Sequence, residues 1–147
     1  MTRDRDTQGR PRNARPRDAL GRPLARAGRT QPPEDEPALA PPLALERAQQ
    51  LLDTGAAFAA HEVLEAVWKA TAGDERALWR GLAQLCVGVT HAQRGNPAGA
   101  RALLDRAADT LAAAPTLHGV DPQRLAGWAR LAATRPADLP APPRLSG

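Results

Sequence analysis

A histidine and a glutamate lie one helical turn apart in a segment that is otherwise strongly apolar. His61 and Glu65 belong to the run Phe58-Ala-Ala-His-Glu-Val-Leu-Glu-Ala-Val-Trp68. On a helix they project into the same sector as Phe58 and Trp68. A buried carboxylate is costly unless it is paired, protonated or bound to a metal. The pair is therefore compatible with a structural hydrogen bond, with acid and base catalysis, or with metal ligation.

A metal site at this pair would need ligands from elsewhere in the chain. The run is not the His-Glu-x-x-His motif of zinc proteases, because Glu65 stands where the second histidine would be. His91 is the candidate third ligand, so the sequence offers His61, Glu65 and His91 as a set for a divalent metal ion. Whether a metal binds, and whether the protein is an enzyme, stays open.

A polar stripe on the next helical segment could complete such a site. Arg80, Gln84 and His91 fall within about 40° of one another around a helix, with Gly88 beside them. The stripe is either the solvated face of its helix or a surface that packs toward His61, with Gly88 allowing close approach. The candidate polar site consists of His61, Glu62, Glu65, Trp68, Arg80, Gln84 and His91.

The alternative to a ligand site is a protein-interaction module. Trp68 and Trp79 would then line a groove for a partner helix or peptide, and the polar residues would only fix the packing. Trp79 and Trp128 each fit a core or a groove position, Cys86 is expected to be a small core hydrophobe, and His118 is expected in a surface loop.

The composition predicts an all-α fold. The chain has no Tyr and no Ile and is rich in Ala and Leu, which favours helices over strands. We expect five helices, at about 43–54, 56–71, 75–94, 97–114 and 122–134. Asn96 and Asp121, each followed by Pro, are typical N-caps, and Asp74 is a third candidate. Short connections predict a compact bundle of antiparallel helical hairpins.

The charge distribution separates the helical region from its ends. Residues 43–134 carry nine basic and nine acidic residues, so the excess positive charge lies outside them. We expect a disordered Arg/Pro-rich tail at 1–41, a helical domain at 42–134 and a Pro-rich, frayed end at 135–147.

A neutral helical region argues against nucleic-acid binding. The single cysteine and the absence of a long apolar segment predict a soluble, cytoplasmic protein without membrane contact. The partner expected is a small ligand or another protein, and a homodimer would help so small a core without being required.

The same residues resemble a known family. The strings Phe58-x-x-His-Glu-x-x-Glu-x-x-Trp68, Arg80-Gly-Leu-x-Gln84 and His91-x-x-x-Gly-Asn-x-x-Gly-Ala100 are similar to the domain of unknown function 309 family over about residues 45–110. The resemblance implies a compact helical fold and a shared polar site at His61, Glu62, Glu65, Trp68, Gln84 and His91. It implies no substrate. Ala59 replaces an aromatic residue that is frequent in the family, which disfavours a large flat ligand.

Overall fold

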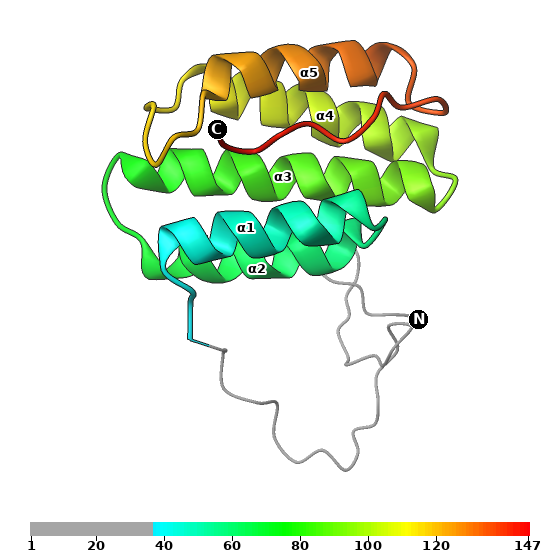
Figure 1. Cartoon of the computed structure of the whole chain (residues 1–147). Coiled ribbons are helices and arrows are strands. Elements are labelled where there is room, and N and C mark those ends of the chain that lie inside the picture. The colour runs from blue at the N-terminus through cyan, green and yellow to red at the C-terminus, as the bar shows by residue number, and fades with distance from the viewer. Residues whose placement is uncertain (1–36) are drawn as a thin grey trace, which may run out of the picture. The chain divides into compact units, whose positions relative to one another are not determined.

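The computed structural model describes residues 37–147, in which five helices follow one another with short connections (Figure 1). They are α1 (Pro41–Asp53), α2 (Ala57–Ala70), α3 (Glu75–Gln93), α4 (Pro97–Ala112) and α5 (Pro122–Thr134). Each helix begins and ends within two residues of its expected bounds, and the all-α fold class is confirmed. Most of the tail predicted at 1–41 lies outside the described residues.

Two of the three predicted N-caps are confirmed. The Asn96 side chain accepts a hydrogen bond from the backbone N–H of Gly99 at 3.0 Å, and Asp121 accepts from two backbone N–H groups at the start of α5. Asp74 stands at the predicted N-cap position of α3, but its side chain makes no capping hydrogen bond. Asp74 is already helical in its backbone angles, and its carbonyl oxygen accepts from the N–H of Ala77 instead.

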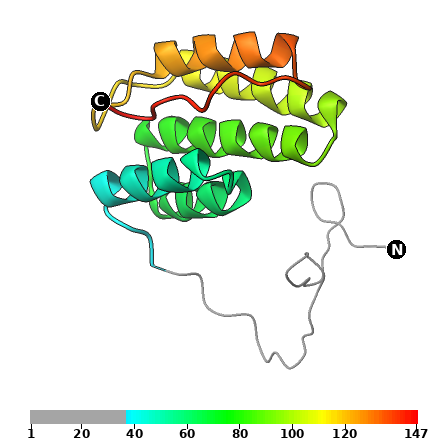
Figure 2. The same cartoon turned by 45° about the vertical axis from the view of Figure 1, so that its right-hand side comes forward.

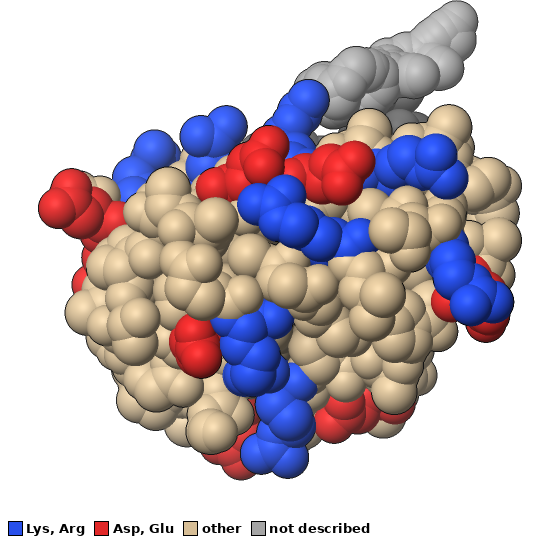
Figure 3. Space-filling model, turned by 90° about the horizontal axis from the view of Figure 1, so that it is seen from above, with Lys and Arg blue, Asp and Glu red and all other residues tan. Residues whose placement is uncertain are grey.

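The helices pack mainly against their neighbours in the sequence, with α3 in the middle (Figure 2). The α1–α2 pair lies on one side of α3 and the α4–α5 pair on the other. The core consists mostly of leucine and alanine, and Trp79 is its largest completely buried side chain. Basic and acidic side chains are interspersed on the face that carries α5 (Figure 3). Among the described residues, no helix is long and apolar enough to cross a membrane.

Gly88 allows a close approach between helices, but the partner is α4. A Cβ atom at Gly88 would lie 2.7 Å from Cγ of Leu104 and 3.2 Å from the backbone nitrogen of the same residue. Of the two interpretations of the polar stripe, the one in which Gly88 allows a close approach toward His61 is not supported. The glycine instead lets the backbones of α3 and α4 approach across the core.

The C-terminal segment, expected to be frayed, is packed against the helices. Residues 135–147 run back between α1 and α5 across α3 (Figure 1). Leu145 is completely buried, and its backbone N–H donates to Oε1 of Gln49 in α1 at 2.7 Å. An extended segment buries only alternate side chains, so its apolar pattern is too short to be recognised in the sequence.

Gly88→Ala should lower the free energy of unfolding by about 1–3 kcal/mol, because the added methyl group overpacks the contact with Leu104. Gly127 is the matched control: it lies inside α5, and a Cβ atom there would meet nothing within 4 Å. Gly127→Ala should raise the free energy of unfolding by about 0.5–1 kcal/mol. Urea denaturation of both variants measures the two effects. Changes of the same sign would contradict this account of α3–α4 packing.

Candidate functional site

The predicted pair lies at the edge of α2, half-way between core and solvent. Nε2 of His61 is 3.6 Å from Oε1 of Glu65, and the two side chains are 17% and 34% exposed. The aromatic ring of Phe58 lies 5.3 Å from the histidine ring, centroid to centroid. The pair is thus a close contact on a partly apolar edge, and it is longer than an ordinary hydrogen bond.

Helix α3 touches this edge of α2 through arginine side chains. The guanidinium of Arg76 lies 4.7 Å from the centre of the Trp68 ring, and that of Arg94 lies 5.2 Å from the centre of the Phe58 ring. Cations stack favourably on aromatic faces. These two contacts mark the two ends of the line along which α2 and α3 meet.

Arg80 and Gln84 continue the row that Arg76 begins, at intervals of four residues along α3. Arg80 is exposed and Gln84 is partly buried. We call the set Phe58, His61, Glu65, Trp68, Arg76, Arg80, Gln84 and Arg94 the α2–α3 seam. Glu62, the remaining candidate on α2, is exposed beside it.

His91 is directed toward the start of α4. Its Nδ1 atom lies 3.0 Å from Nδ2 of Asn96, the N-cap residue of α4. Among residues 37–147, no three His, Cys, Asp or Glu side chains are placed to hold a metal ion together. The proposed set of His61, Glu65 and His91 is therefore not brought together. Helical periodicity places His91 on the polar stripe of α3. It does not show toward which neighbouring helix the ring points.

Three polar atoms of seam residues are buried without a hydrogen-bond partner within the described part of the chain: Nδ1 of His61, Nε1 of Trp68 and Oε1 of Gln84. Buried polar atoms in folded proteins are nearly always hydrogen-bonded. The other two tryptophans follow that rule: Nε1 of Trp79 donates to Glu75, and Nε1 of Trp128 donates to the carbonyl of Ala141.

Burial sets the protonation state of the seam histidine. It lowers the pKa of His61 below the ordinary value and outweighs the attraction of the Glu65 carboxylate. The carbonyl of Phe58 also favours the charged ring, although it does not meet hydrogen-bond geometry with Nδ1, and Lys69 opposes that charge. The pKa of His91 is also lowered, first by burial and then by Arg94. His61 is therefore neutral near pH 7.

A second polar cluster, which the sequence did not indicate, joins the α4–α5 connection to α3. Nε2 of His118 lies 2.6 Å from Oε2 of Glu75, which also accepts from Trp79. These two hydrogen bonds, first that of Trp79, lower the pKa of the Glu75 carboxyl. His118 has a positive φ of 56°, which is uncommon for a residue other than glycine. Only the tertiary fold brings Glu75 and His118 together, because they are far apart in the sequence.

Cys86 is completely buried among apolar side chains, as predicted. Burial raises the pKa of its thiol to about 12, so the reactive thiolate form is suppressed. Trp79 is also completely buried and cannot line an exposed groove. The prediction of a partner groove between Trp68 and Trp79 was therefore wrong.

The stability of the protein should fall as the pH is lowered from about 7.5 to about 5.5, the range in which a free histidine takes up a proton. His61 and His91 have lowered pKa values in the folded state, so the unfolded chain binds protons first and is favoured by acid. The slope is at most about 1.4 kcal/mol per pH unit for each histidine. Urea denaturation at several pH values measures it. His61→Gln should reduce the slope, and an unchanged slope would contradict the buried, neutral state of His61.

The comparison with known proteins concerns the part of the chain that contains the seam. Residues 45–103 match the model of the family described as domain of unknown function (DUF309), a range that includes α2, α3 and the whole seam. No curated protein and no solved structure matched the chain significantly. The resemblance to the DUF309 family is thus supported over residues 45–103.

Proposed function

We propose that the α2–α3 seam binds a small polar ligand that carries a negative charge. The observation that supports this most directly is the group of three buried, unpartnered polar atoms on His61, Trp68 and Gln84. Each such atom costs about 1–3 kcal/mol when it is left without a hydrogen bond. A ligand that supplies the missing partners recovers this free energy, which gives the site both affinity and selectivity.

The charges of the seam favour an anion. Arg76, Arg80 and Arg94 have no carboxylate partner among the described residues, whereas Glu65 is the only acidic member of the seam. Guanidinium groups bind carboxylates and phosphates through paired hydrogen bonds. Trp68 adds an indole N–H donor, and neutral His61 can donate or accept through Nδ1. Because His61 and Trp68 are separated by two helical turns, about 10 Å, a ligand that meets both is elongated.

Tryptophan side-chain NMR tests the site with two internal controls. Each indole N–H gives its own signal, and only that of Trp68 lacks a partner within the described residues. Titration with inorganic phosphate, citrate and succinate should shift the Trp68 signal, whereas those of Trp79 and Trp128 stay in place. If the Trp68 signal does not move with any of the three, and its proton exchanges freely with solvent, water alone satisfies the seam and the proposal fails.

Gln84→Leu should keep or raise the free energy of unfolding, by up to about 2 kcal/mol, because it removes a buried acceptor that has no donor. It should at the same time abolish the ligand-induced shift of the Trp68 signal. Such a residue stabilises the bound state at the expense of the free protein. Thermal denaturation with and without the titrated anion measures both effects.

Gln49→Leu is the matched control for this substitution. The Gln49 amide is fully engaged, since Nε2 donates to the carbonyl of Pro143 and Oε1 accepts from the N–H of Leu145. The same change should therefore lower stability, by about 1–3 kcal/mol, and leave the Trp68 shift intact. Equal losses of stability in both variants would show that Gln84 is an ordinary structural residue.

A further inference from the structure

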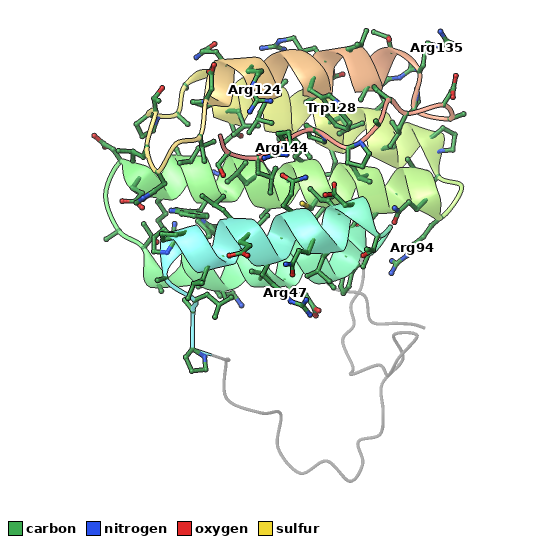
Figure 4. The ribbon with its side chains drawn as sticks, viewed as in Figure 1. Arg47, Arg94, Arg124, Trp128, Arg135 and Arg144 are labelled. Carbon is green, nitrogen blue, oxygen red and sulfur yellow. The ribbon has the colours of Figure 1, made fainter. Side chains whose placement is uncertain are left out.

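The C-terminal segment is held against α1 and α5 by hydrogen bonds to its backbone, in addition to the burial of apolar side chains such as Leu145. The carbonyl of Pro143 accepts from Gln49 at 3.0 Å, and the N–H of Leu145 donates to the same amide at 2.7 Å. Nε1 of Trp128 donates to the carbonyl of Ala141 at 3.0 Å, and the guanidinium of Arg124 donates to that of Arg144 at 2.7 Å. The side chains that make these hydrogen bonds come from α1 and α5, and Arg124 and Trp128 of α5 are labelled in Figure 4.

Only two side chains of residues 141–147 are buried: those of Pro143 and Leu145, two positions apart, with exposed Arg144 between them. This is the alternation of an extended strand, in which every second side chain faces the surface beneath. The segment therefore presents a short pattern, Pro-x-Leu, to the surface between α1 and α5. We call that surface, with Gln49, Arg124 and Trp128 at its sides, the α1–α5 groove.

Backbone hydrogen bonds combined with pockets for alternate side chains are a common mode of peptide recognition. The hydrogen bonds can form with an extended backbone of any sequence. The buried proline and leucine side chains make the binding selective for particular segments. Gln49 is suited to this role because its amide donates to the carbonyl of Pro143 and accepts from the N–H of Leu145, while Nε2 also donates to Asp53 within α1. Nothing in these contacts requires the bound segment to be covalently joined to α5.

We propose that the α1–α5 groove is a docking site for an extended Pro-x-Leu segment of a partner protein, and that residues 141–147 close it in the free protein. The tethered segment competes with any free peptide at a high effective concentration. The apparent affinity for a partner is reduced by the fraction of molecules in which the groove is open. The segment is thus an internal cap that a partner must displace. This proposal is independent of the α2–α3 seam.

Peptide binding to a full-length variant with a weakened cap tests the proposal. Leu145→Ala removes the buried anchor and leaves every groove residue in place. A fluorescein-labelled peptide Ala-Pro-Pro-Arg-Leu-Ser-Gly, which repeats residues 141–147, should bind this variant at least about tenfold more tightly than it binds the wild-type chain. Fluorescence anisotropy measures both affinities, and circular dichroism confirms that the variant is helical.

Two controls identify the contacts. A peptide with alanine in place of leucine should not bind Leu145→Ala, and the double variant Gln49→Leu/Leu145→Ala should not bind the original peptide. If folded Leu145→Ala binds no peptide at millimolar concentration, or binds both peptides equally, the segment is a fixed part of the core and the proposal is wrong.

A second measurement uses the wild-type chain and does not depend on the folding of the variant. A spin-labelled copy of the peptide at high concentration should broaden the indole N–H signal of Trp128 and leave that of Trp68 sharp, because only Trp128 borders the groove. Absence of selective broadening would overturn the proposal. A wild-type dimer that this peptide dissociates would make a second copy of this chain the occupant in place of another protein, which also overturns it.

Discussion

Helix α3 has to bury apolar side chains against α2, α4 and the C-terminal segment at once, and the rest of the structure depends on this requirement. Leu78, Leu82 and Leu85 are completely buried, and Gly88 lets α4 approach at close range. Only one stripe of α3 is left without cover. Arg76, Arg80 and Gln84 lie on that stripe, whereas Thr90 is buried on α3 and donates a hydrogen bond to the carbonyl of Cys86.

Hydrogen-bonded polar groups and polar groups without a partner mark two different regions of the described part of the chain. Gln49 and Trp128 make complete hydrogen bonds to the C-terminal segment, and these bonds connect α1 with α5. Gln84 and Trp68, the same residue types, each keep a buried atom that has no partner among residues 37–147 at the α2–α3 seam. The first pair therefore contributes to the stability of the free protein. The second pair gains its hydrogen bonds only when something else supplies them, which is the physical basis of the proposed ligand site.

Much of the fold could be predicted because local chemistry decides it. Helix ends follow from glycine and proline, and the caps at Asn96 and Asp121 need only backbone groups within three residues. The His61–Glu65 contact is equally local, since one helical turn brings the two side chains together. The position of Cys86 in the core follows from its place on the apolar side of its helix. Contacts between residues that lie within one or two helical turns of each other can be predicted from their spacing in the sequence.

The contacts between helices and segments that are distant in the sequence were decided only by the tertiary structure. It joined His118 to Glu75 and seated the C-terminal segment on Gln49, and among the described residues it did not bring His91 together with His61 and Glu65. Periodicity states on which face of a helix a residue lies, but the identity of the opposing surface comes from packing. By itself the sequence determined five helices, their ends and a polar edge at His61 and Glu65. Only the fold decided what meets that edge, because side chains separated by tens of residues become neighbours when the core is buried.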